Sequence, residues 1–317
     1  MSSVPAAPPQ QEFRHEAYFY SGPDELVAGC TGFLREGVAA GEPALVVLAA
    51  EKLELVRREL GAGGEGVLFA DMAEVGANPA RIIPAWQEFV DRHAASGVGM
   101  RGIGEPIWAG REGQELVECQ GHETLLNLAF DGGPAWRLMC PYDTATLAPE
   151  VLVEAERSHP WVWRGATEAP SRTYCNPLDS SLPRLPDPPP AALELALLPR
   201  SMAPARQLAA RLAAQAGLSV SRVAELTMAV NEVVENCLSH AGHGHLRAWC
   251  EGGGVVVEVA GGRIDDPLAG RRVPDAASEG ARGLWLATQL CDLVQIRNQD
   301  GVAAVRLHMH RGGTGAG

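Results

Sequence analysis

Two side chains with complementary chemistry stand four residues apart in a predicted helix of the C-terminal half. The segment 223–240 reads V-A-E-L-T-M-A-V-N-E-V-V-E-N-C-L-S-H, and its apolar residues form one stripe for burial against a sheet. Glu232 and Asn236 project from one face of this helix, one turn apart. An amide oxygen can bind a hard cation such as Mg²⁺, and a carboxylate can take a proton from a nucleophile. The pair is therefore a candidate metal-nucleotide site, although such pairs also occur on solvated helix faces.

A second signal lies 44 residues after Asn236. The run Gly280-A-R-G-L-W-L286 is a glycine-rich turn that leads into a predicted helix at 283–291. Free backbone N–H groups at a helix start, together with the helix dipole, favour an anionic phosphate. The two signals together indicate nucleotide binding.

The order of these motifs resembles the GHKL ATPase superfamily, and most of all the bacterial anti-sigma-factor serine kinases of the partner-switching type. The resemblance covers about residues 193–311: an N-E-x-x-x-N helix, a β-hairpin, a glycine-rich loop and a G-x-x-G-L helix start. It implies that Glu232 is the general base for phosphoryl transfer to a serine and that Asn236 is the Mg²⁺ ligand.

The same resemblance assigns further residues and partners. It implies a second glycine box formed by Gly280, Gly283 and Leu284, with Arg282 as a phosphate contact. It also implies ATP and Mg²⁺ as cofactors, and a sigma factor or an anti-anti-sigma (STAS-type) protein as partner. Relatives of this superfamily often form dimers, so a homodimer is one expected state.

The chain departs from the superfamily at the first glycine box, which should read D-x-G-x-G after a strand. Ala260 and Gly261 stand where the adenine-binding Asp belongs, and Asp265 and Asp266 come four or five residues late. Either the loop is rearranged so that one of these carboxylates substitutes, or adenine recognition is impaired. The missing pair of hydrogen bonds would cost roughly 1–3 kcal/mol of binding free energy.

Polar and aromatic residues of the N-terminal half form a second candidate site. They follow predicted strands or share a helix face, and could line a pocket for a small polar or aromatic ligand; otherwise they are loop anchors and surface ion pairs. These residues are Glu105, Trp108, Glu118, His122, Tyr142 and Asp143.

Five segments of this half look like the MEDS sensory domain, which is similar to RecA-type ATPase cores without their phosphate loop. They are H-E-A-x-F-Y from His15, F-x-R-E-G-x-x-A-G-E-P from Phe33, R-G-I-G-E-P-I-W from Arg101, C-Q-x-H-E from Cys119 and C-P-Y-D from Cys140. The resemblance covers about residues 13–163 and implies a domain that senses a small molecule. It does not fix the ligand.

The elements that must hold these residues follow two patterns. Before residue 166, strands alternate with helices, which indicates a mainly parallel sheet with helices on both faces, an α/β fold. The strands are expected at 17–20, 43–48, 67–69, 98–103 and 136–140, and the helices at 25–39, 51–60, 79–95, 112–129 and 149–158.

After residue 190 the pattern indicates helices on one side of an antiparallel or mixed sheet, an α+β sandwich. The strands are expected at 193–198, 245–250, 255–259, 293–297 and 302–308, and the helices at 203–214, 221–240 and 283–291. Residues 166–190 hold seven prolines and should form an extended linker. The expected domains are a flexible tail at 1–12, a sensory domain at 13–165 and an ATPase-like domain at 191–317.

Composition excludes several classes of protein. The formal net charge of −13 over 317 residues repels nucleic acid, and no apolar run is long enough to span a membrane. Lys52 is the only lysine, so no Gly-Lys pair and no Walker A phosphate loop is present. Seven scattered cysteines without a C-x-x-C pair indicate buried thiols in a reducing compartment, and we expect a cytoplasmic protein. Three histidines at 240, 243 and 245 favour a solvated loop over a metal site.

Two functions remain open at this point. In the first, the chain is a partner-switching transcription regulator whose N-terminal domain senses a signal and whose C-terminal domain phosphorylates its partner with Mg-ATP. In the second, the C-terminal domain is an anti-sigma binding module whose nucleotide site is degenerate. An enzyme acting through the N-terminal half lacks a nucleophile–base pair.

Overall fold

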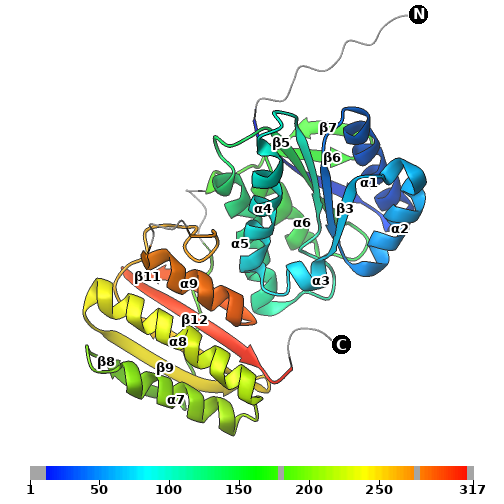
Figure 1. Ribbon diagram of the computed structural model, residues 1–317. Coiled ribbons are helices and arrows are strands. Elements are labelled where there is room, and N and C mark those ends of the chain that lie inside the picture. The colour runs from blue at the N-terminus through cyan, green and yellow to red at the C-terminus, as the bar shows by residue number, and fades with distance from the viewer. Residues whose placement is uncertain (1–11, 178–181, 275–278, 313–317) are drawn as a thin grey trace, which may run out of the picture. The chain divides into compact units, whose positions relative to one another are not determined.

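The chain divides into two compact units in the computed structural model (Figure 1), which describes residues 12–177, 182–274 and 279–312. The first unit comprises Met1–Val75 and Ala85–Ser180, and the second comprises Gly76–Pro84 and Ser181–Gly317. The expected tail at 1–12 lies almost wholly outside the described residues. The domain limits expected from the sequence stay predictions.

The first unit is built on a seven-stranded sheet in the order β3-β2-β4-β5-β1-β6-β7. All neighbouring strands run parallel except the last pair, β6 and β7. The strands are β1 (Arg14–Tyr20), β2 (Ala44–Leu48), β3 (Val67–Asp71), β4 (Met100–Gly104), β5 (Trp136–Asp143), β6 (Trp161–Arg164) and β7 (Thr167–Pro170). The central strands are buried along nearly their whole length, as continuous apolar runs in a parallel sheet should be.

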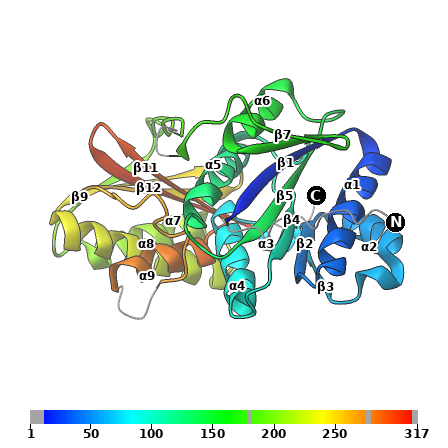
Figure 2. The same ribbon diagram turned by 90° about the horizontal axis from the view of Figure 1, so that it is seen from above.

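Helices cover both faces of this sheet. They are α1 (Gly22–Ala39), α2 (Ala50–Leu60), α3 (Met72–Val75), α4 (Ile82–Ala94), α5 (Gly113–Ala129) and α6 (Pro149–Ser158), with a short 3₁₀ turn η1 (Gly61–Gly64). Helices α1 and α2 lie on one side of the sheet and α4 and α5 on the other (Figure 2). Tyr18 and Met139 point into the core under α1 and α2. The alternation of side chains along a strand therefore turns His15 and Cys140 toward the opposite face.

The second unit is an antiparallel sheet in the order β11-β12-β10-β9-β8, and its three helices lie in front of the sheet in Figure 1. The strands are β8 (Leu193–Leu197), β9 (Gly244–Glu251), β10 (Gly254–Ala260), β11 (Leu293–Gln299) and β12 (Val302–His310), and the helices are α7 (Met202–Gln215), α8 (Val220–Ala241) and α9 (Glu279–Leu290). Side chains of all three helices and of every strand share one hydrophobic core. The expected fold classes of both halves are confirmed.

Local sequence explains where α8 begins and ends. The side chain of Ser219 accepts a hydrogen bond from the N–H of Arg222 and caps the first turn. Gly242 ends the helix in the left-handed conformation, with φ +74°, which glycine adopts without steric cost. The helix that carries Glu232 and Asn236 is thus fixed at both ends.

The structure differs from the expected elements in three places. Strand β7 occupies the start of the proline-rich segment, where an edge strand tolerates proline because one side of it needs no ladder hydrogen bonds. The expected helix 79–95 starts as a 3₁₀ turn, η2 (Pro79–Arg81), before α4. Helix α9 begins at Glu279, four residues earlier than expected.

The 3₁₀ turn η2 belongs to the second unit. Asn78 donates hydrogen bonds to the carbonyls of Thr288 and Cys291, and Arg81 donates to the carbonyls of Thr288 and Gln289. Carbonyls at a helix C-terminus lack partners within the helix, so these two side chains satisfy the end of α9. No helix among the described residues is long and apolar enough to cross a membrane.

Candidate functional site

Helix α8 presents one apolar face to the sheet and one polar edge to a cavity. Val230, Val233 and Val234 are buried in the core, whereas Glu232 and Asn236 are half-buried at the edge of that face. This is the arrangement expected from the spacing of the two side chains. The core contacts of the valines hold the two polar groups in place.

A cavity of about 410 Å³ lies beside Asn236, within the second unit. It is bordered by α8, the loop after β10, the start of α9 and strand β12. Its lining residues are Val233, Asn236, Cys237, His240, Val259, Gly261, Arg263, Ile264, Asp265, Asp266, Ala269, Gly270, Leu284, Ala303 and Val305. A mostly apolar cavity of this size with a few polar groups is typical of a small-molecule site.

Gly283 of α9 packs directly against the two candidate residues of α8. A Cβ atom at this position would lie 2.9 Å from Asn236 Nδ2 and 3.3 Å from Glu232 Oε2. The glycine therefore lets the start of α9 approach the carboxylate and the amide. The structure brings together three of the residues that the sequence selected, from segments that the chain separates by more than forty residues.

The amide of Asn236 has an unsatisfied donor. Its Nδ2 atom is buried and makes no hydrogen bond within the described part of the chain. A buried polar atom without a partner is costly, and the cost falls when a ligand supplies the partner. Because the amide can be turned by 180°, either its nitrogen or its oxygen can face such a ligand.

The floor of the cavity at the first glycine box is closed to larger residues. A Cβ at Gly261 would lie 2.5 Å from Cys237 Sγ and 2.9 Å from the carbonyl oxygen of His243. Burial raises the pKa of Cys237, so this wall of the cavity is an uncharged thiol. An aspartate at position 261 would need α8 and β9 to move apart.

The two late aspartates line the cavity but are held by local contacts. Asp265 pairs with Arg263 at the surface, and Asp266 Oδ1 accepts a hydrogen bond of 2.9 Å from the N–H of Leu268. Neither carboxylate forms an observed hydrogen bond with the residues around Gly261. The substitution of one of them for the missing Asp stays a prediction.

The second glycine box lies on the first turns of α9, where Gly280 and Gly283 are already helical. Leu284 lines the cavity, and Arg282 is exposed and lies outside its lining. The expected glycine-rich turn before the helix is therefore wrong for Gly280, because the helix starts at Glu279. The role of Arg282 as a phosphate contact stays a prediction.

The sensory candidates of the first unit divide into two groups. Glu105 and Asp143 come together at the carboxyl ends of β4 and β5, where Tyr20 of β1 lies opposite Asp143 in register. The Glu105 carboxylate accepts hydrogen bonds from Tyr20 (2.9 Å) and from Lys52 (2.6 Å). Burial, ahead of its neighbours, raises the pKa of Glu105, and it raises the pKa of Tyr20 as well. Lys52 is the only lysine of the sequence, but the sequence did not predict its contact with Glu105.

The remaining candidates are buried in the fold or stack locally. Trp108 is half-buried under the guanidinium of Arg111, 4.2 Å from its ring centroid. Glu118 and His122 are buried on α5, and the buried ring of Tyr142 packs edge-on against His159 at 5.5 Å. Their role in ligand binding stays a prediction.

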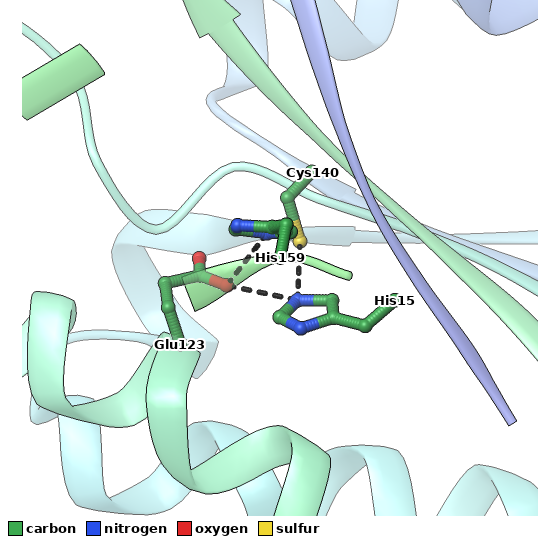
Figure 3. A group of neighbouring side chains, drawn as sticks. All are labelled: His15, Glu123, Cys140 and His159. Carbon is green, nitrogen blue, oxygen red and sulfur yellow. Dashed lines mark hydrogen bonds and ion pairs between the residues drawn. The ribbon is translucent and has the colours of Figure 1, made fainter. Parts of the chain in front are cut away.

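One group of side chains is not predictable from local sequence because its members are far apart in the chain. His15, Glu123, Cys140 and His159 lie together in the first unit, all buried (Figure 3). Their ligand-type atoms lie within 4.8 Å of one another. The segments H-E-A from His15, H-E from His122 and C-P-Y-D from Cys140 carried three of them, but no local spacing joins them.

Two family models match the chain. The model of the MEDS domain, the methanogen/methylotroph DcmR sensory domain, matches residues 14–160, and that of the histidine kinase-like ATPase domain matches residues 195–309. No curated protein sequence matches the chain.

Among solved structures, the chain is similar to the RsbU and RsbW domains of a protein from Mycobacterium tuberculosis. The identity is 20% and the TM-score 0.29, and the match covers 40% of this chain and 33% of the other. The chain thus spans about a third of that protein. Because both family models match, this chain joins a MEDS sensory domain to a histidine kinase-like ATPase domain.

Proposed function

We propose that this chain is a regulator of the partner-switching type, in which the MEDS domain receives a signal and the kinase-like domain phosphorylates a protein partner on serine. The observation that supports it most is the meeting of Glu232, Asn236 and Gly283 beside a cavity of about 410 Å³. A sensory domain joined to a kinase-like ATPase domain fits a regulatory role.

The residues at the cavity fit Mg-ATP at its phosphate end. The amide of Asn236 carries a buried atom without a partner, and its oxygen is of the donor type that Mg²⁺ accepts. Gly283 leaves the backbone of α9 close to this amide, where N–H groups near a helix start can hold phosphate oxygens. Bound Mg-ATP would supply the phosphoryl group and the charge neutralisation that its transfer needs.

Glu232 would then act on the attacking serine. Its half-buried carboxylate lies one helical turn from Asn236, and Asn231 donates a hydrogen bond of 3.4 Å to its Oε1. Its Oε2 lies on the side of Gly283. A carboxylate in this position can accept the proton of a serine hydroxyl and orient its oxygen, as a general base does.

The partner we propose is a protein and not a nucleic acid. The net charge of −13 disfavours phosphate backbones. By resemblance the partners are a sigma factor and a STAS-type anti-anti-sigma protein, the second of which carries the acceptor serine. The signal read by the MEDS domain is a small molecule or a protein.

Phosphoryl transfer tests this function directly. The full chain is incubated with labelled Mg-ATP and the STAS-type proteins encoded in the same genome, and label on a serine is measured. We expect transfer by the native chain, and loss of at least about a hundredfold in Glu232→Gln, because a general base contributes a factor of this order. The matched control is Glu235→Gln, the same change at an exposed position of α8. Equal transfer by both variants would contradict the role of Glu232.

A second function is favoured by Gly261. The cavity floor there has no room for the adenine-binding Asp, and Asp265 and Asp266 are engaged elsewhere. In this alternative the domain sequesters its partner without nucleotide. Co-elution of the native chain with a sigma factor or STAS-type protein in size-exclusion chromatography, unchanged by Mg-ATP and by Asn236→Ala, would favour this second function.

A further inference from the structure

Four buried side chains from four elements of the first unit converge at one point (Figure 3). His15 comes from β1, Glu123 from α5, Cys140 from β5, and His159 from the residue directly after α6. Each is at most 1% exposed. Two imidazoles, a carboxylate and a thiol are all metal-ligating groups. The phosphoryl transfer proposed for the kinase-like domain does not use these four side chains.

Three of the six distances between their ligand atoms lie close to the edge lengths of a coordination tetrahedron. His15 Nε2 lies 3.0 Å from Glu123 Oε2 and 3.4 Å from Cys140 Sγ, and His159 Nε2 lies 3.3 Å from the same carboxylate oxygen. Ligand bonds of about 2.0–2.1 Å to nitrogen or oxygen and about 2.3 Å to sulfur give tetrahedral edges of roughly 3.3–3.6 Å. All four atoms lie within 4.8 Å of one another. Inward shifts of the side chains would bring the remaining distances to tetrahedral values.

The Nδ1 atom of each imidazole lies within hydrogen-bond distance of an acceptor oxygen. His159 Nδ1 lies 2.7 Å from the carbonyl oxygen of Ala155, which can only accept a hydrogen bond. Nδ1 therefore carries the proton, and in the neutral ring Nε2 carries the lone pair. The hydroxyl of Ser158, 3.1 Å away, adds a second contact on the same side.

His15 is oriented in the same way by Asn127. The Nδ2 of Asn127 donates to the carbonyl of Ser158 at 2.7 Å, so its Oδ1 is the atom that faces His15 Nδ1 at 3.2 Å. An amide oxygen accepts, and His15 Nδ1 is therefore the donor. Partners of this kind fix the tautomer of metal-binding histidines and aim the other nitrogen at the metal.

Two lone pairs and a carboxylate thus face each other in a fully buried space. Both Nε2 atoms approach Glu123 Oε2, and in neutral rings neither has a proton to give. A cation at the centre would satisfy all three groups.

We propose that His15, Glu123, Cys140 and His159 bind one Zn²⁺ ion in a tetrahedral site. The thiol of Cys140 gives up its proton to solvent as the sulfur–zinc bond forms, so one proton leaves for each ion bound. The two negative ligands, Glu123 and the Cys140 thiolate, balance the charge of the ion. A neutral site is compatible with complete burial.

The site is structural and not hydrolytic. Four protein ligands fill the coordination sphere of zinc and leave no position for water. Strands β1 and β5 already pair along Arg14–Tyr20, and the ion would link them to α5 and to the residue after α6. The stability of the sensory unit would then depend on the metal.

Metal content and a cobalt spectrum test the site in the full chain. We expect about one zinc per chain after purification, and Co²⁺ added to chelator-treated protein should give tetrahedral absorption with a sulfur-to-cobalt charge-transfer band. Cys140→Ser should abolish that band. The matched control is Cys119→Ser, a buried thiol of α5 that faces Arg111, and it should keep it.

The melting temperature with and without Zn²⁺ gives a second test of the site. With Zn²⁺ in excess the native chain should gain about 10 °C in the melting temperature of the first unit over the chelated form, as tight binding to the folded state requires. A purified native chain without stoichiometric zinc, with no charge-transfer band and no shift on adding Zn²⁺, would overturn the proposal. So would a band that survives in a folded Cys140→Ser protein; if that variant does not fold, the band and the shift of the native chain still decide.

Discussion

Gly261 shows how a single residue limits what the cavity beside Asn236 can accept. A Cβ at this position would overlap Cys237 Sγ at 2.5 Å. Replacing Gly261 by aspartate would therefore require a change of the backbone. The chain directly after β10 lies closer to α8 than an aspartate side chain would permit. If the cavity binds ATP as we propose, its apolar walls would contact the adenine, or Asp265 or Asp266 would do so after their present contacts are broken.

The close approach at Gly261 predicts a loss of stability on substitution. Gly261→Ala forces Cys237 or the carbonyl of His243 to move and should lower the free energy of unfolding of the second unit by about 1–3 kcal/mol. Gly312→Ala is the control, because nothing lies within 4 Å of a Cβ there. Urea unfolding followed by far-ultraviolet circular dichroism measures both, and equal midpoints would refute the steric explanation.

His308 makes the second unit sensitive to acid. Burial, ahead of the nearby Arg306 and His310, lowers its pKa from 6.5 to about 3, and Gln295 lies 3.0 Å from its Nε2. The unfolded chain binds the proton more readily, so stability is lost as the pH falls from about 6.5 toward 3. The loss at pH 5 should be about 2 kcal/mol.

Substitution isolates this effect. His308→Gln removes the titrating group, so its stability should fall less between pH 7 and pH 5 than that of the native chain. His245→Gln, at an exposed position of β9, serves as the control. The measurement is the midpoint of urea unfolding at each pH. If His308→Gln and the native chain lose stability in parallel, His308 does not carry the acid sensitivity.

At the scale of the elements, a buried ion pair fixes the centre of the parallel sheet. Glu16 of β1 accepts two hydrogen bonds from Arg137 of β5, at 2.6 and 2.7 Å, and a third from the indole of Trp163 on β6. Both charged groups are nearly inaccessible. Three adjacent strands are thus joined by one carboxylate.

Removal of that carboxylate should be costly. Glu16→Gln leaves the buried Arg137 charge with only the more distant carboxylate of Glu168, 4.0 Å away, and should lower the free energy of unfolding of the first unit by about 3 kcal/mol. The exposed pair of Glu88 and Arg92 on α4 provides the control, and Glu88→Gln should cost less than about 0.5 kcal/mol. A similar small cost for both changes, measured by chemical unfolding, would show that the buried pair is dispensable.

The elements also show how far the sequence can predict this fold. Helix α6 has the bounds expected from its proline start and apolar spacing, because local signals determined them. Strands β6 and β7 were not expected, since Trp161–Arg164 is short and gains its place by pairing with β1, a contact that the local sequence does not encode. Helix α9 likewise begins at Glu279, earlier than the glycine-rich sequence predicted.

The candidate sites follow the same division. Glu232 and Asn236 are predictable because four residues on one helix determine their face. The group of His15, Glu123, Cys140 and His159 is not, because only the sheet register and the α5 contact bring these residues together. The histidines at 240, 243 and 245 are close together in sequence, but they were predicted to be solvated, and their side chains are exposed.

At the scale of the whole molecule, the two units carry separate cores and separate chemistry. The first has a parallel sheet with a buried polar group that we assign to zinc, and the second has an antiparallel sheet with an apolar cavity and a polar rim. The proposals can therefore fail independently. Substitutions at the proposed zinc ligands of the first unit would leave the residues around the cavity of the second unit unchanged.

Calorimetric titration of the full chain with Mg-ATP tests the central claim, that the cavity beside Asn236 binds this nucleotide. We expect saturable heat for the native chain and for Glu235→Gln, and its loss in Asn236→Ala, because the amide would supply both the metal ligand and the unpartnered donor. No heat from the native chain at millimolar Mg-ATP, or undiminished heat from Asn236→Ala, would contradict it.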